Sequence, residues 1–99
     1  MLYSIVGIDV ENSLQARLDA RPQHVERLVE LKTQGKLVMA GPNPAIDSSD
    51  PGDAGFSGSI IVAEFDSLKV AQDWANQDPY LLSGVYDSVT VKPFNLVLP

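Results

Sequence analysis

The order in which apolar segments follow one another constrains the fold of this chain more than any other feature. Strand-like runs occupy residues 2–10, which are rich in β-branched and aromatic residues, 36–40 and 59–65, and a last run covers 85–91 and 94–98. Two segments with the helical spacing of apolar residues lie between them, one after the first run and one after the third. The order β-α-β-β-α-β predicts an α+β, ferredoxin-like fold, in which two helices cover one face of a four-stranded antiparallel sheet.

The size and charge of the chain limit the classes of protein to which it can belong. Its 99 residues are enough for one domain, which we expect to span residues 1–99. A net charge of −6 repels phosphate backbones, so no nucleic-acid partner is expected. The absence of cysteine excludes disulfides and thiolate metal sites. No apolar stretch approaches the roughly 18 residues that span a bilayer, and no signal peptide is recognisable, so we expect a cytoplasmic protein with no membrane partner.

The first helical segment, residues 14–34, contains a proline that complicates the prediction. Pro22 removes one backbone hydrogen bond and clashes with the preceding turn, so either the helix kinks there or a short first turn precedes a helix with Pro22 near its start. Asn12 or Ser13 is the expected N-cap, and Gly35 is the expected stop. The apolar positions with helical spacing are Leu14, Leu18, Val25, Leu28, Val29 and Leu31.

The connections in the second half of the chain carry strong turn signals. Residues 41–44, Gly-Pro-Asn-Pro, are most simply a rigid turn after the second strand. Residues 45–58 are predicted to be a loop, long enough to act as a lid or to be mobile, with a solvated acidic tip that lacks the calcium-loop pattern. Asp66 or Ser67 is the expected cap of the second helix, and Lys92-Pro93 is expected to interrupt the last strand.

The apolar character of the first strand predicts the oligomeric state. Residues 2–10 are apolar on both faces, which is typical of an inner strand covered on each side. The two predicted helices cover only one face of the sheet. A bare apolar sheet face is an association surface, and twofold pairing is the commonest way to cover it. We therefore expect a homodimer that packs two sheets together.

The only histidine, His24, lies on the predicted first helix with Arg21 one turn and Arg17 two turns before it. At about 100° per residue these side chains fall within or beside the apolar arc, facing the sheet or a cleft. A kink at Pro22 would rotate Arg17 out of this alignment, which favours Arg21 and His24. The ordinary interpretation of His24 is a half-buried or surface histidine without a chemical role. No metal site is expected, because one histidine without cysteine leaves only carboxylates as further ligands.

The segment from Asp78 to Gly84 is predicted to be a single capped turn closed by glycine. Aspartate before proline is a good N-cap, with Pro79 at the first helical position, so capping alone explains Asp78. Tyr80 is most simply a packed aromatic residue with a solvated hydroxyl. The residues themselves leave open whether this turn has a chemical role.

Several short motifs, taken together, cover nearly the whole chain. They are Arg21-x-x-His24, Gly35-Lys36-Leu37, Ala40-Gly41-Pro42, Asp78-Pro79-Tyr80, Gly84 and Val91-Lys92-Pro93-Phe94. Their order and spacing resemble the YCII (YciI-like) family of small bacterial proteins. The resemblance implies a ferredoxin-like subunit that dimerises as an α+β barrel. It also implies that His24 and Asp78 form an active-site pair in a cleft beside the sheet, with Arg21 next to them.

Most members of that family have no assigned reaction. One relative is a dehydrochlorinase that acts on a chlorinated hydroxyhydroquinone, and the wider fold group includes lactone isomerases and monooxygenases. For this chain the resemblance implies a lyase or an isomerase that acts on a small cyclic or aromatic substrate. The alternative that stays open is a dimeric module that binds a metabolite without turning it over.

The residues implied by the resemblance suit proton transfer. An imidazole exchanges a proton near neutral pH, and a carboxylate on its other nitrogen orients it and stabilises its charged form, which are the roles predicted for His24 and Asp78. Arg21 is predicted to hold an anionic oxygen of the substrate. No cofactor is expected. The other predicted substrate-binding residues are Gly41, Pro42 and Tyr80.

Overall fold

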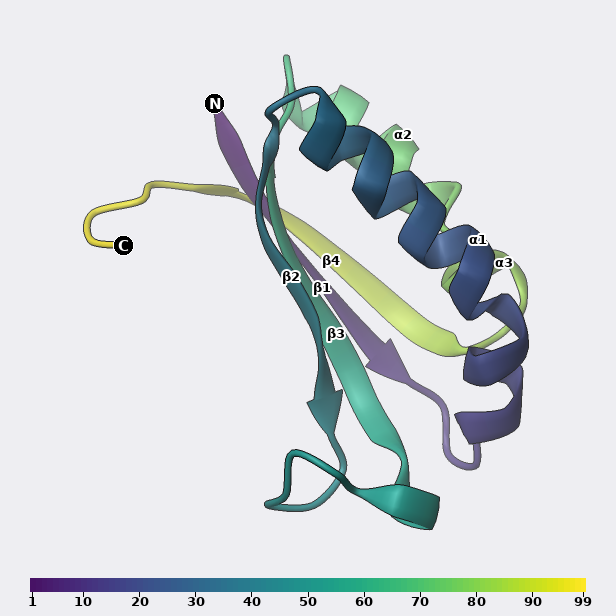
Figure 1. Ribbon diagram of the computed structural model, residues 1–99. Helices are drawn as coiled ribbons and strands as arrows, with labels where there is room; N and C mark the ends of the chain where they lie inside the picture. Colours follow the sequence, from purple (N-terminus) through teal and green to yellow (C-terminus); the bar gives the residue numbers. More distant parts are fainter.

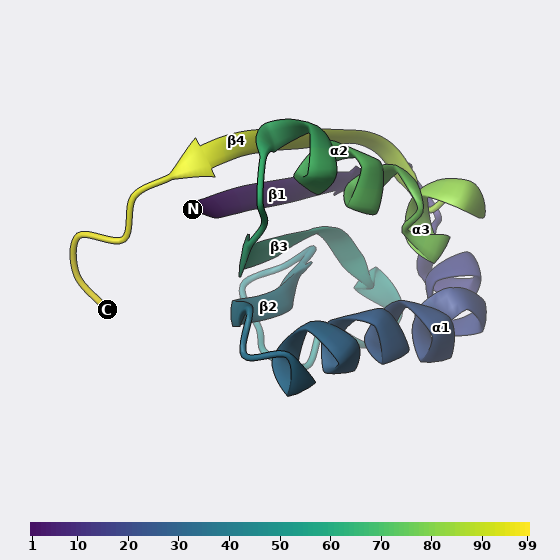
Figure 2. The same ribbon diagram turned by 90° about the horizontal axis from the view of Figure 1, so that it is seen from above.

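The computed structural model describes residues 1–99 as one antiparallel sheet with helices packed against it. The strand order is β2-β3-β1-β4, and the helices lie on one side of the sheet (Figure 1, Figure 2). The predicted α+β, ferredoxin-like order is therefore confirmed, with β1 as an inner strand. The elements are β1 (Leu2–Asp9), α1 (Leu14–Thr33), β2 (Leu37–Pro44), the 3-10 turn η1 (Gly52–Ala54), β3 (Phe56–Glu64), α2 (Leu68–Asn76), α3 (Pro79–Leu82) and β4 (Tyr86–Phe94).

The first helix, α1, is continuous through Pro22, so the alternative of a helix that begins near this proline is wrong. Pro22 has no N–H, so the carbonyl of Leu18 lacks its helical hydrogen-bond donor. Both residues are exposed. Water can therefore replace the missing hydrogen bond, while packing of the opposite side keeps the helix in place. Neither α1 nor any other helix is long and apolar enough to cross a membrane.

The two ends of α1 differ in how closely they follow the sequence signals. Ser13 occupies the N-cap position, but its side chain makes no capping bond. Its hydroxyl donates instead to Asp9 Oδ2 at 3.0 Å, and Asn12 takes a positive φ of 59° in the turn between them. The expected side-chain cap is thus absent, because the hydroxyl is engaged by Asp9. Gly35, with a φ of 72°, ends the helix as predicted.

Both edge strands run through prolines that the sequence predicts to interrupt or end them. Residues 41–44, expected to be a turn, are the second half of β2, where Pro42 lies opposite Ser59. β4 continues through Pro93, and residues 95–99, expected in part to extend it, lie outside the sheet. Because β2 and β4 each have a neighbour on one side only, a proline can sit there without removing a ladder bond.

The loop predicted for residues 45–58 is shorter in the structure. β3 begins at Phe56 rather than Ser59, and η1 turns the chain before it. The N–H of Ala45 donates to the carbonyl of Gly55 at 2.9 Å, which closes the base of the loop. The segment rich in Asp, Ser, Pro and Gly therefore forms a loop only between Ala45 and Gly55.

The core lies between the helices and one face of the sheet, while the opposite face of β1 is open. On that open face Val6 and Ile8 are 36% and 53% exposed. The covering of both faces expected for residues 2–10 is therefore not supplied by a single copy of the chain. The buried residues of the main core cluster are Tyr3, Ile5, Leu31, Ile61, Ala63, Phe65, Ala71 and Ala75.

Gly58 of β3 lies so close to β1 that a larger residue cannot be accommodated. A Cβ at this position would overlap the carbonyl oxygen of Gly7, which belongs to the backbone and cannot rotate away. We expect Gly58→Ala to lower the free energy of unfolding by about 3 kcal/mol, as measured by urea denaturation. Gly41→Ala is the matched control, since its new Cβ would meet no atom within 4 Å. Equal effects of the two substitutions would contradict this account.

Candidate functional site

His24 and Asp78 lie 54 positions apart in the chain and meet in the structure. Nδ1 of His24 lies 2.9 Å from Oδ1 and 3.1 Å from Oδ2 of Asp78, and both side chains are buried. An ionised carboxylate only accepts hydrogen bonds, so Nδ1 carries the proton in this pair. Nε2 is then the ring nitrogen that remains to exchange a proton with a ligand.

Asp78 also has the structural role that its place in the sequence indicates. It is the N-cap of α3, with Pro79 at the first helical position, and its Oδ1 accepts from the backbone N–H of Tyr80 at 2.9 Å. The capping interpretation and the pairing with His24 are therefore compatible. The cap fixes the carboxylate in the place where the imidazole reaches it.

Tyr80 covers one face of the His24 ring. The two rings are stacked, with centroids 3.9 Å apart and planes 11° apart. The guanidinium carbon of Arg17 lies 4.6 Å from the centroid of the Tyr80 ring. Burial raises the pKa of Tyr80 above its ordinary value, and the charges of Arg17 and Arg21 oppose this. The stacked phenol stays neutral near pH 7 and restricts the orientation of the imidazole.

Arg17 is held more firmly than Arg21, although the sequence favours Arg21. Arg17 is 4% exposed, and its Nε and Nη2 donate to the two carboxylate oxygens of Asp9, each at 2.9 Å. Nη2 also donates to the carbonyl of Gly58 and to Ser59 Oγ, each at 3.0 Å. Burial acts to lower the pKa of Arg17, but the hydrogen bond and charge of Asp9 outweigh it and raise that pKa. Arg21 is exposed and forms none of the ion pairs of the structure.

The sequence favours Arg21 over Arg17 because a kink is expected at Pro22. Because α1 is continuous, Pro22 does not rotate Arg17 away, and it stays on the side of the helix that carries His24. A signal was available in Asp9, an acidic residue that ends an apolar strand shortly before this helix. No comparable signal marks Ser59, because its position depends on the pairing register of β3.

A cavity of about 320 Å³ lies between α1, β2, β3 and α3, and His24 lines it. Asp78 does not line this cavity and reaches it only through its bond to His24. The structure thus brings all six predicted site residues to one place, while their roles stay predictions. The other predicted residues, which all line the cavity, are Arg21, Gly41, Pro42 and Tyr80. The lining residues with polar or aromatic side chains that the prediction left out are Arg17, Phe56 and Ser59.

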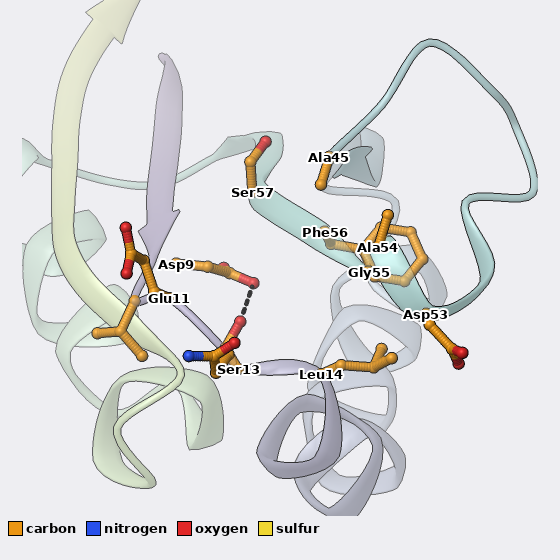
Figure 3. Close-up of a pocket in the computed structure, with 12 residues that line it drawn as sticks. Asp9, Glu11, Ser13, Leu14, Ala45, Asp53, Ala54, Gly55, Phe56 and Ser57 are labelled. Carbon is orange, nitrogen blue, oxygen red and sulfur yellow. Dashed lines mark hydrogen bonds between the residues drawn. The ribbon is translucent and has the colours of Figure 1, made fainter.

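A second cavity, of about 360 Å³, lies beside the loop that follows β2 (Figure 3). Its lining includes the acidic residues Asp9, Glu11 and Asp53, and Phe56 lines both cavities. Figure 3 shows Asp9 turned towards Ser13, to which it is hydrogen-bonded. No three potential ligands in the chain are grouped so as to hold a metal ion. Because this second cavity also lacks a histidine, the cavity lined by His24 is the candidate functional site.

Comparison with known proteins places this chain within a family. The model of the YCII-related domain matches residues 1–95 of the chain. The chain belongs to the YCII-related family. Protein YciI of Escherichia coli O6:H1 is 55% identical over 97 residues, which cover 98% of this chain and 99% of that protein. An uncharacterized protein of Haemophilus influenzae is 50% identical over 97 residues, with the same coverage of both chains.

Among solved structures, this YCII-related chain is similar to 5-chloro-2-hydroxyhydroquinone dehydrochlorinase (TftG) from Burkholderia phenoliruptrix AC1100. That structure is a complex with 2,5-dihydroxybenzoquinone. The TM-score is 0.84 at 26% sequence identity, and the match covers 96% of this chain and 94% of TftG. The two proteins therefore share their fold over nearly the whole length of both chains.

Tyr86, which packs edge-on against Tyr80, is expected to make the stability of the fold sensitive to alkaline pH. Its ring packs on β1 so closely that a Cβ at Gly7 would lie 2.5 Å from its Cζ. Burial raises the pKa of Tyr86 well above its ordinary value, and the charge of Arg17 opposes this only in part. Above about pH 10 the phenol ionises in the unfolded chain but not in the folded one, so the folded state binds more protons. The stabilisation is complete below that pH and is lost as the pH rises further.

We expect the free energy of unfolding to fall steeply from about pH 10 to about pH 11, and less steeply in Tyr86→Phe. Urea denaturation at a series of pH values measures both slopes. Tyr86→Phe also removes the polar hydroxyl from the core, so the comparison uses the slope rather than the absolute stability. Identical slopes in the two proteins would show that another group causes the alkaline loss.

Proposed function

We propose that this protein is a small-molecule enzyme that moves protons with His24 and Asp78, and that its substrate is a small cyclic or aromatic compound. One observation carries the proposal: Nδ1 of His24 is bound by Asp78 while the ring lines a cavity. In such a pair the carboxylate selects the tautomer and stabilises the imidazolium that forms when Nε2 accepts a proton.

The proposed reaction is an elimination or an isomerisation. Nε2 of His24 takes a proton from a saturated ring carbon next to a carbonyl carbon, as in the keto form of an oxygenated ring, and the electron pair of the broken C–H bond moves towards the carbonyl to give an enolate. In an elimination this pair then expels a leaving group such as chloride. In an isomerisation the imidazolium returns the proton to a different carbon. Both sequences balance in atoms and charge without an oxidant or a reductant.

The remaining predicted residues bind the substrate in this proposal. Arg21 reaches the cavity from the exposed side of α1 and holds an anionic oxygen of the ring. Gly41 and Pro42 form a wall of the cavity on β2, where the missing side chain of Gly41 leaves room for a flat molecule. Tyr80 contributes an aromatic surface beside His24.

The comparison with TftG supports a substrate of this kind. By its name TftG removes chloride from 5-chloro-2-hydroxyhydroquinone, and its structure holds 2,5-dihydroxybenzoquinone. A cavity of about 320 Å³ is within the range in which proteins bind small ligands. A single oxygenated ring therefore fits the site in size as well as in chemistry.

The proposal is tested by looking for proton transfer directly. The protein is incubated in D2O with 5-chloro-2-hydroxyhydroquinone and, separately, with 2,5-dihydroxybenzoquinone, and chloride release and deuterium uptake at ring carbons are followed. For an enzyme, at least one rate rises in proportion to protein concentration above the rate without protein. Binding of both rings with neither reaction would favour the alternative, a non-catalytic metabolite-binding or regulatory module.

We also propose a homodimer that covers the open face of the sheet. Val6 and Ile8 are exposed apolar residues of an inner strand, where a second copy of the same face can bury them. Ile8→Lys is expected to convert a dimer into a monomer, as measured by size-exclusion chromatography with light scattering. Leu82→Lys is the matched control, since Leu82 is 68% exposed but lies on the helical side. A monomeric wild-type protein would refute the proposal.

A further inference from the structure

The cavity lined by His24 differs in charge from the chain as a whole. The chain has thirteen acidic and seven basic residues, yet no aspartate or glutamate lines this cavity. Its charged lining consists of Arg17 and Arg21, whereas the second cavity is lined by Asp9, Glu11 and Asp53. Asp9 compensates the charge of Arg17 from outside this cavity, so the lining contributes the unpaired charge of Arg21 together with N–H donors of Arg17, and this combination is suited to bind an anion.

The hydrogen bonds of Arg17 leave part of its guanidinium unused. All four come from Nε and Nη2, which donate to Asp9, Gly58 and Ser59. Nη1, with two N–H groups, takes part in none of them. The Arg17 side chain is already immobile, so binding a ligand at Nη1 costs little additional entropy of that side chain.

Ser59 supplies a second donor next to Arg17. It is 3% exposed, lines the cavity, and its Oγ accepts from Arg17 Nη2 at 3.0 Å. That bond uses an acceptor position of the hydroxyl, and the hydroxyl proton can rotate towards a ligand oxygen. Because the oxygen of this hydroxyl accepts a hydrogen bond from a charged group, its O–H becomes a stronger donor. The sequence gives Ser59 no role, and the proposed proton transfer does not use it.

We propose that Arg17 and Ser59 form a fixed oxyanion-binding site, and that the substrate is a small planar organic anion with an oxygen bound there. This inference rests on the proposed function only in taking the His24 cavity as the substrate site. Tyr80 and Phe56 provide aromatic surface for the ring of the ligand, and Arg21 contributes a mobile second charge at the exposed side. The anionic oxygen is thus held at a defined place relative to His24.

Benzoate and benzamide test the site, because they have the same shape and differ in charge. Each is titrated into the ¹⁵N-labelled full-length protein, and binding is followed by NMR chemical shifts. We expect benzoate to bind at least about tenfold more tightly than benzamide, because a hydrogen bond to a charged group contributes about a factor of ten or more to the affinity. The chemical-shift changes should include Ser59 and Arg17. Ser59→Ala should weaken benzoate binding about tenfold and benzamide binding less, because a hydrogen bond to the neutral amide oxygen is weaker than one to a carboxylate.

Two further variants separate the possible outcomes. Ser57→Ala, on the same strand but outside the cavity, is the matched control and should leave both affinities unchanged. Arg21→Gln should weaken benzoate binding less than Ser59→Ala does. Equal binding of the two probes, no binding of either, or an effect of Arg21→Gln alone would overturn the inference.

This measurement is independent of turnover. If benzoate is preferred as expected but no ring undergoes proton exchange or elimination, the oxyanion site stands and the proposed catalysis fails. If turnover is found and benzamide binds as well as benzoate, the catalysis stands and the oxyanion site fails. ¹⁵N-labelled His24→Gln protein should retain the preference for benzoate, because the donors of the proposed site are on Arg17 and Ser59.

Discussion

His24→Ala is expected to abolish measurable turnover and to leave the protein folded. Histidine is the side chain that most often acts as a general base or acid, and His24 is the only histidine of the chain and lines the cavity. Loss of a general base or acid typically costs about 10²- to 10⁴-fold in rate. Asp78 keeps its bond from the Tyr80 N–H, so α3 remains capped in the variant. Chloride release or ring deuteration measures the rate, and thermal unfolding measures the fold.

A second substitution separates proton transfer from packing. His24→Gln retains an N–H donor that can reach Asp78 and a planar group beside Tyr80, but it cannot take up a proton. We expect it to be as inactive as His24→Ala and closer to wild type in stability. Gln23→Ala, at an exposed neighbouring position of α1, should be fully active. Activity of His24→Gln within about tenfold of the wild type would rule out His24 as the base.

Asp9→Ala is expected to lower the free energy of unfolding by about 3 to 5 kcal/mol, the largest loss of stability that we predict. The substitution leaves the buried guanidinium of Arg17 without its carboxylate partner, and Ser13 also loses its acceptor. Such a loss is a large part of the total stability of an ordinary domain. Urea denaturation monitored by circular dichroism measures it.

The double variant Asp9→Ala/Arg17→Met distinguishes the cost of an unpaired charge from the value of the ion pair. Replacing both partners by apolar groups removes the buried charge, so the double variant should be more stable than Asp9→Ala alone. Asp73→Ala, which breaks the exposed pair with Lys69, is the control and should change stability by less than about 0.5 kcal/mol. If the double variant is less stable than Asp9→Ala, the unpaired charge of Arg17 is not the cause of the destabilisation.

The site could be predicted only in part, and the parts differ in origin. His24 and Arg21 were placed towards the sheet by helical spacing, whereas the pairing with Asp78 came from the family resemblance and not from any spacing. The capping signal at Asp78 was sufficient to explain that residue without His24. In the structure one carboxylate oxygen serves both bonds, so the local signal and the distant contact coincide.

The sequence by itself determined the fold class and most of the elements. Runs of β-branched residues, the 3.6-residue spacing of apolar positions and the stop at Gly35 are local patterns, and each acts within a few residues of the chain. Pro42 and Pro93 misled the prediction of strand ends, since their cost depends on whether the strand lies at an edge. That is a property of the sheet and not of the segment.

Only the tertiary structure decided which groups surround the cavity. Arg17 meets Ser59 across 42 positions of the chain, and His24 meets Asp78 across 54. Such meetings depend on strand register and on how a helix is rotated over the sheet, because a shift of one residue in β3 would turn Ser59 to the opposite face. Packing of the whole domain sets that register, so no local pattern in the chain could reveal that Arg17 and Ser59 line the same cavity as His24.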